Sequence, residues 1–131
     1  MRIIAILVAA AALAFAGCAA QQPINNVANA PFVLPQGKSL SMAQIQRAIV
    51  AAGASLGWQM QPTGPGKLSG RLVLRTHVAD VDVEHDTKSY SIKYRDSQNL
   101  DARDGMIHKN YNGWIENLDK AIRTQVQLAA S

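Results

Sequence analysis

Four stretches in the middle of this chain of 131 residues place an apolar side chain at every second position. In the clearest, at 79–84, three aliphatic residues alternate with three carboxylates, and the others run over 58–61, 67–75 and 89–95. This period sends apolar side chains to one face of a β-sheet and polar side chains to the other. Because turn residues separate the stretches, we predict a four-stranded antiparallel meander with one face exposed to solvent.

The polar positions of the predicted sheet are charged, and the sign of the charge changes from strand to strand. Tight turns expected near 76–77 and at 86–87 predict two cross-strand ion pairs, Arg71 with Asp82 and Asp80 with Lys93. Opposite charges that face each other across strands help to fix the register. We therefore predict a charged outer face as a candidate interaction surface, with the members Arg71, Asp80, Asp82, Lys93 and Arg95.

Two segments that flank the strands have the spacing of amphipathic helices. Ser41 and Gln44 form a capping box, in which each side chain accepts a backbone N–H at the start of a helix, and Gly53 can supply the left-handed residue that ends it. A second helix is expected to begin near Ile107 or His108. Apolar positions recur every three or four residues; the predicted buried stripes are Met42, Ile45, Ala48, Ile49 and Ala52, and then Tyr111, Trp114, Ile115, Leu118, Ile122 and Val126.

The order of these elements defines the fold class. Residues 39–131 are expected to form one α-β-β-β-β-α domain, which is long enough for a single core. A sheet with one apolar face and two amphipathic helices bury their apolar surfaces against each other. We therefore predict an α+β domain, a two-layer sandwich in which an N-terminal and a C-terminal helix cover one face of the meander.

The first residues have the features of a secretory signal peptide. Arg2 supplies a positive charge, Ile3–Ala16 is apolar, and two small residues precede Cys18. We predict that residues 1–17 are a signal peptide. The alternative is an uncleaved transmembrane helix, because the 18 residues from 3 to 20 contain no charge and reach the lower end of the length that spans a bilayer.

Cys18, placed directly after Ala-Gly, resembles the lipobox of bacterial lipoproteins. The resemblance implies that the Cys18 thiol receives a diacylglycerol, that the signal peptide is cut before this residue, and that the new amine is acylated with a chain such as palmitate. Phe15 departs from the lipobox pattern, in which Leu is usual at that position. By the same resemblance Ala19 provides no signal for retention in the inner membrane, which implies the periplasmic face of the outer membrane.

Residues 18–38 have the composition of a flexible tether. They contain several Gln, Asn and Ala residues and three prolines, and they show no sustained period. The segment 32–34, Phe-Val-Leu, is the exception: it either docks on the domain as a short extended arm or is only locally hydrophobic. Because Cys18 is the one cysteine, the chain cannot form an internal disulfide, and packing alone must stabilise the domain.

The charge of the chain limits the kinds of partner. The formal net charge is only +4 and the basic residues are dispersed, whereas a nucleic-acid-binding domain gathers Lys and Arg on one face. We expect no nucleic-acid partner. The expected partners are the membrane, through the lipid anchor, and an envelope protein or a cell-wall component.

The histidines and carboxylates do not form a metal-binding motif. His77, His85 and Asp86 have suitable side chains, but eight residues along a strand span about 26 Å, which is too far for one metal ion. The polar segment before the second helix holds oxygen ligands without the one-three-five spacing of a calcium loop: Asp96, Asn99, Asp101 and Asp104. We expect no metal and no cofactor.

Residue types of a catalytic triad also occur in this part of the chain. Ser97 and His108 could act with Asp101 or Asp104. No serine lies in a Gly-x-Ser-x-Gly sequence, which would hold a nucleophile on a strained turn. We therefore expect that the domain is not an enzyme.

Two stretches of sequence, 89–100 (SYSIKYRDSQNL) and 107–115 (IHKNYNGWI), together with the lipobox resemble a widespread group of small, uncharacterised proteobacterial lipoproteins. The similarity extends over about residues 40–122. The resemblance implies a location in the cell envelope and brings no assigned activity.

Two hypotheses for the function follow. In the first, the chain is a membrane-anchored envelope lipoprotein that acts as a non-enzymatic binding or structural module through its charged sheet face or the loop before the second helix. In the second, it is a periplasmic lipoprotein that binds a ligand or metal, or catalyses a reaction, at the loop Asp96–His108. A domain of this size with 5% aromatic residues has little material for a deep apolar pocket, which favours the first.

Overall fold

The computed structural model describes residues 20–131, so the predicted signal peptide, residues 1–17, and Cys18 lie outside the described residues. The described residues form two helices and seven strands, in this order: β1 (Gln21–Pro23), β2 (Val27–Pro31), α1 (Met42–Ser55), β3 (Gln59–Gly64), β4 (Lys67–Leu74), β5 (His77–His85), β6 (Ser89–Gln98), β7 (Met106–His108) and α2 (Lys109–Ala129). Within the described part, no helix is long and apolar enough to cross a membrane.

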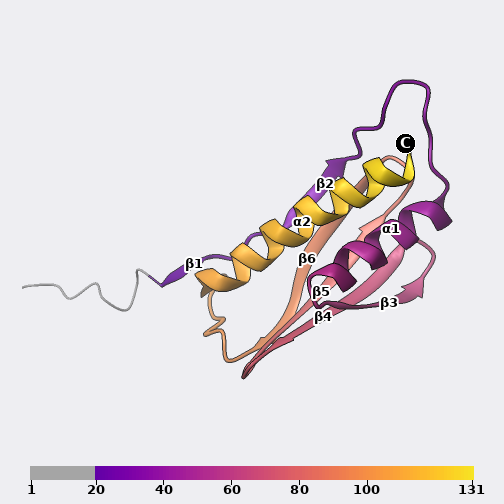
Figure 1. Cartoon of the computed structure of the whole chain (residues 1–131). Coiled ribbons are helices and arrows are strands. Elements are labelled where there is room, and N and C mark those ends of the chain that lie inside the picture. Colours follow the sequence, from indigo (N-terminus) through magenta and orange to yellow (C-terminus); the bar gives the residue numbers. More distant parts are fainter. Residues whose placement is uncertain (1–19) are drawn as a thin grey trace, which may run out of the picture.

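The main sheet has five antiparallel strands in the order β2-β6-β5-β4-β3, and both helices lie on one of its faces (Figure 1). The predicted α+β class is confirmed, and β3 to β6 form a meander. The prediction of four strands was one too few, because β2 adds to the edge of the sheet beside β6. A separate two-stranded sheet joins β1 to β7.

The faces of the strands agree with the prediction. The inner positions of β4, β5 and β6, which include Leu68, Val81 and Ile92, are buried against the helices. On α2 the predicted stripe is buried at five of its six positions, and Trp114 is only partly buried. One continuous apolar core therefore joins the sheet to both helices.

The predicted register was wrong by two residues at both hairpins. Asp80 pairs with Arg71 where Asp82 was expected, and Lys93 pairs with Asp82 where Asp80 was expected. A shift by two leaves each side chain on its own face, so the alternation of polar and apolar residues cannot detect it. The turns decide the register instead.

Both turns differ from those expected. Between β4 and β5 the turn is one residue earlier, because Arg75 adopts a left-handed φ of 57° and Leu74 pairs with His77. Between β5 and β6 the Asp86 carboxylate accepts the N–H groups of Lys88 (2.7 Å) and Ser89 (2.8 Å). These hydrogen bonds lower the pKa of Asp86 and close a longer turn that pairs His85 with Tyr90.

Helix α1 begins as predicted and ends later. Ser41 and Gln44 form the expected capping box, with N···O distances of 3.1 and 2.9 Å. Gly53 does not end the helix but lies buried within it, where an added Cβ would meet the Met60 side chain. The left-handed residue after the helix is Gly57, with φ of 86°. Helix α2 begins at Lys109, just after the predicted start.

The segment expected to be a flexible tether is largely part of the fold. Its residues 21–23 and 27–31 form β1 and β2, and backbone hydrogen bonds join Ile24 to Gly105 and Phe32 to Lys88. Phe32 stacks on Tyr90 with ring centroids 5.0 Å apart. Of the two alternatives for 32–34, the docked arm is therefore confirmed, although Val33 itself is exposed. Composition suggested a spacer because most of these contacts use backbone groups, which leave no apolar period in the sequence.

Candidate functional site

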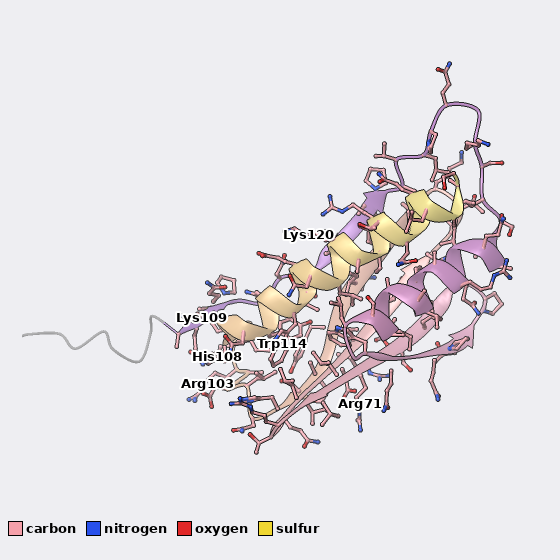
Figure 2. The ribbon with its side chains drawn as sticks, viewed as in Figure 1. Arg71, Arg103, His108, Lys109, Trp114 and Lys120 are labelled. Carbon is pink, nitrogen blue, oxygen red and sulfur yellow. The ribbon has the colours of Figure 1, made fainter. Side chains whose placement is uncertain are left out.

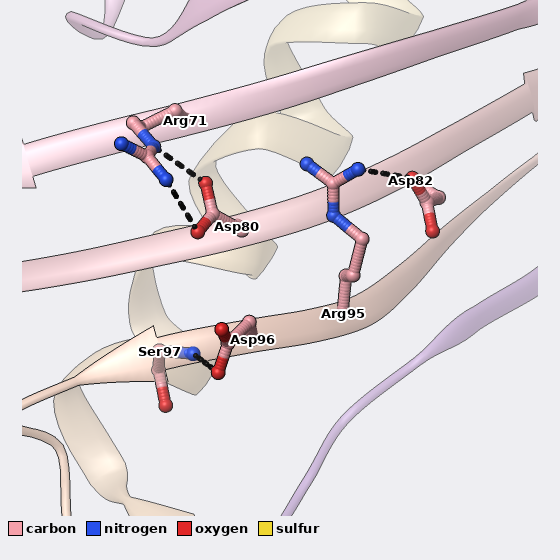
Figure 3. A network of polar contacts seen from close by, with 6 residues as sticks. All are labelled: Arg71, Asp80, Asp82, Arg95, Asp96 and Ser97. Atoms are coloured by element: carbon pink, nitrogen blue, oxygen red, sulfur yellow. Dashed lines mark hydrogen bonds and ion pairs between the residues drawn. The ribbon is translucent and has the colours of Figure 1, made fainter.

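The outer face of the main sheet gathers the charged residues of three adjacent strands. All five residues predicted for the interaction surface lie on it, and Figure 3 shows four of them. The face also includes three residues that the prediction did not name. We call this surface the charged face and define it by Lys67, Arg71, Asp80, Asp82, Glu84, Lys93, Arg95 and Asp96.

The tightest contact on the charged face joins β4 to β5. Arg71 donates two hydrogen bonds to the Asp80 carboxylate, Nε to Oδ1 at 2.8 Å and Nη2 to Oδ2 at 3.1 Å (Figure 3). The Asp80 side chain is buried whereas that of Arg71 is about half exposed. The hydrogen bonds to the Asp80 carboxylate and its negative charge raise the pKa of the Arg71 guanidinium, which stays charged.

A β-bulge in β6 brings a second arginine onto the same face. The register between β5 and β6 shifts between Asp80 and Val81, so that Arg95 and Asp96 both point outward. Arg95 lies 3.6 Å from Asp82, and Lys93 lies 3.5 Å from Glu84. These pairs are about half exposed, and such contacts contribute little to stability.

The charged face is electrically balanced. It has four cationic side chains and four carboxylates, so its formal charge is zero. A balanced pattern of both signs gives no net attraction for a polyanion, but it can match a partner whose own charges alternate. Most of its charged side chains are exposed to solvent, whereas Asp80 is buried.

In the segment Asp96–His108, the polar side chains at the end of β6 and in β7 make local hydrogen bonds. The carboxylate of Asp96 accepts the N–H of Ser97, and the hydroxyl of Ser97 pairs with that of Tyr94 at 2.8 Å. His108 Nδ1 accepts the N–H of Asn110 at the start of α2. Among the hydrogen bonds of residues 20–131, none joins Ser97 to His108, so the candidate triad is not assembled in this conformation.

The other candidate ligands are also apart. His77 and His85 lie at opposite ends of β5. Residues 20–131 contain no group of three or more His, Cys, Asp or Glu side chains placed to hold a metal ion. His77 Nδ1 lies 2.7 Å from the carbonyl oxygen of Asn99, whereas His85 Nε2 is buried without a hydrogen-bond partner in the described structure.

The tyrosines belong to the core. Tyr90 donates its hydroxyl hydrogen bond to Asp119, and Tyr94 packs edge to face on Tyr111 with ring centroids 5.5 Å apart. Burial is the main cause that raises the pKa of Tyr111, whose hydroxyl has no partner among the described residues. Tyr90 is buried and Tyr94 is partly buried against the core, and each hydroxyl reaches a side-chain partner, Asp119 for Tyr90 and Ser97 for Tyr94.

Asn112 is a structurally important residue whose role the sequence left open. Its side chain is only 8% exposed; Oδ1 accepts the N–H of Asn25 (3.0 Å), and Nδ2 donates to Gln22 Oε1 (3.1 Å) and to the carbonyl of Pro23 (2.9 Å). One side-chain amide on α2 thus holds residues 22–25, which we call the N-terminal segment, against this helix. Its position three residues before the buried Ile115 was the available signal, since that spacing lies at the edge of the stripe.

The first described residues, Ala20 and Gln21, lie at the same end of the domain. The carbonyl of Ala20 accepts the N–H of Lys109 (2.8 Å), and Gln21 Nε2 donates to the carbonyl of Asp101 (2.9 Å). Figure 2 shows Arg103, His108 and Lys109 close to the point where the chain reaches the domain. The described structure therefore places Ala20 and Gln21 directly on the domain surface.

Comparisons of the chain with protein-family models, with curated proteins and with solved structures gave no match.

Proposed function

We propose that this chain is a lipid-anchored lipoprotein of the bacterial envelope whose domain is a non-enzymatic binding module. Cys18 would bear the lipid, and the periplasmic face of the outer membrane would be its location. The observation that most supports the anchor is the position of the one cysteine, after an apolar stretch and two residues before the first described residue. Because Ala20 is hydrogen-bonded to Lys109, a lipid on Cys18 would be attached only two residues from a residue held on the domain.

The proposed recognition surface is the charged face. The sheet is covered by helices on one side only (Figure 1), and the other side presents polar groups of both signs. An envelope protein or a cell-wall component with alternating charges would match this surface. Balanced charge argues against a polyanionic partner such as nucleic acid.

Replacement of the cysteine tests the anchor. We expect Cys18→Ser to abolish lipidation, because serine has no thiol to receive the diacylglycerol, so the protein should leave the membrane fraction or accumulate as a precursor. Fractionation and mass spectrometry of the wild-type and variant proteins measure this. A wild-type protein that keeps Met1 in the membrane would support the transmembrane alternative, and normal processing of the variant would refute the lipoprotein proposal.

Photocrosslinking in intact cells tests the recognition surface. A photoreactive residue in place of Lys93 should form a discrete adduct with an envelope partner, because this position is exposed on the charged face, opposite Asp82. The matched control is Lys120, which is exposed on α2. Charge reversal of Arg95 to Glu in the crosslinking protein should reduce the adduct. Adducts of equal yield at both positions, or an adduct unaffected by the charge reversal, would contradict the assignment of this surface.

A further inference from the structure

The domain is elongated (Figure 1), and Ala20, the first described residue, lies at one of its two ends, where its carbonyl accepts the N–H of Lys109. Only Ala19 separates Cys18 from Ala20. Two residues of extended chain span at most about 7 Å. A lipid on Cys18 would therefore hold this end of the domain at the bilayer rather than on a long spacer.

Three segments form this end, which we call the proximal end: the β4–β5 turn, the loop Asn99–Gly105 and the first six residues of α2, 109–114. Side chains connect them. Asn99 Nδ2 donates to Thr76 Oγ1 at 2.7 Å, and the carbonyl of Asn99 lies 2.7 Å from His77 Nδ1. The His77 ring in turn lies 6.2 Å from the ring of Trp114. The proximal end is thus one connected surface, and the start of α1 and the end of α2 lie at the opposite end (Figure 1).

The tip of the β4–β5 hairpin exposes an aliphatic pair. Val73 is 57% and Leu74 is 46% exposed, although both are large apolar residues in a strand. Arg75 follows them in the turn. Aliphatic side chains beside a long cationic one suit the boundary between acyl chains and headgroups, where the apolar part is buried and the charge stays at the phosphates.

The charges of the proximal end favour a phospholipid surface only weakly. Arg75, Arg103 and Lys109 are exposed there, and the carboxylates of Asp101 and Asp104 are exposed beside them. Three cations against two carboxylates leave a small excess. Contact with the bilayer would therefore depend mainly on the lipid anchor and the aliphatic pair, with the cations adding attraction to lipid phosphates.

We propose that the proximal end of the domain lies against the phospholipid bilayer, with Val73 and Leu74 in the headgroup region and Arg75, Arg103 and Lys109 facing lipid phosphates. This proposal rests on the proposed lipid anchor at Cys18. It gives the domain one orientation: the strands of the main sheet run away from the membrane, and the charged face is turned sideways, where a partner can reach it.

Fluorescence quenching in vesicles tests this orientation. The mature full-length protein is reconstituted in vesicles of phosphatidylethanolamine and phosphatidylglycerol, and Leu74→Cys is labelled with an environment-sensitive fluorophore. Leu128→Cys is the matched control, since Leu128 is an exposed leucine near the end of α2, at the opposite end of the domain. We expect nitroxide lipids to quench the label at 74 severalfold more strongly than the label at 128, and its emission to shift to shorter wavelength.

The same experiment separates failure of the orientation from failure of the anchor. In a lipidated protein the thiol of Cys18 is blocked, so the protein without an introduced cysteine should take no label. Labelling of that protein would refute the anchor and with it the orientation. Equal quenching at 74 and 128 in a protein that floats with vesicles and has a blocked Cys18 would refute the orientation alone. Arg103→Cys provides a second label site at the proximal end, in case Leu74→Cys disturbs the hairpin.

Discussion

Asn112→Ala is expected to lower the free energy of unfolding by about 2 kcal/mol and to release the N-terminal segment from the domain. The substitution removes three hydrogen bonds and leaves the N–H of Asn25 and the carbonyl of Pro23 without their partner. Urea unfolding of the purified protein measures the loss, and limited proteolysis between residues 20 and 38 detects the released segment.

The matched control for this prediction is Asn117→Ala. Asn117 lies on the same helix and is exposed, so removal of its amide should change the free energy of unfolding by no more than about 0.5 kcal/mol. If both variants unfold at the same urea concentration and resist protease equally, Asn112 does not hold the segment.

Release of the segment should also change how the domain sits at the membrane. With the contacts of residues 20–25 lost, the chain between Cys18 and β2 becomes the spacer that its composition suggests. We expect Asn112→Ala to stay in the membrane fraction while the quenching of a label at position 74 decreases. Anchoring and orientation would then depend on different residues.

Gly66→Ala is expected to lower the free energy of unfolding by about 3 kcal/mol, because two costs add. Gly66 has a left-handed φ of 67°, and an added Cβ would lie 2.4 Å from the backbone carbonyl oxygen of His85. That oxygen cannot move freely, because the N–H of His85 donates to the carbonyl of Gly66 and fixes the two strands together. Thermal or urea unfolding measures the loss.

Two other glycines separate the two costs. Gly37 has a similar φ of 77° with nothing within 4 Å of an added Cβ, so Gly37→Ala should show the backbone strain alone, about 1 kcal/mol. At Gly64 φ is not left-handed and the space around it is open, so alanine should be tolerated there. If Gly66→Ala lowers the free energy of unfolding no more than Gly37→Ala does, the contact with His85 has no effect on stability.

Much of the fold could be predicted from local patterns. The period of two in β4 to β6 determined which side chains face the helices, since a strand turns each successive side chain to the opposite face. The capping box at Ser41 set the start of α1, because it satisfies backbone groups within one turn of chain. The five residues predicted for the charged face lie on it for the same reason, because the face of each side chain depends only on whether its position along the strand is odd or even.

The pairing of those residues was decided by the tertiary structure. A register shift by two keeps every face unchanged, so Arg71 could equally have been paired with Asp82 by pattern alone. The left-handed Arg75 fixes the β4–β5 turn and so selects Asp80 as the partner of Arg71. The hydrogen bonds of Asp86 fix the β5–β6 turn and so pair Lys93 with Asp82. The bulge that turns both Arg95 and Asp96 outward had no separate signal in the sequence.

The sequence by itself determined that one cysteine follows an apolar stretch, that two helices flank the strands, and which faces are apolar. Only the tertiary structure decided that the segment after the cysteine belongs to the domain. The physical reason is that β1 and β2 are held by backbone hydrogen bonds to strands distant in sequence and by the amide of Asn112. Such contacts need no apolar period, and they exist only once β6, β7 and α2 have brought their partners together.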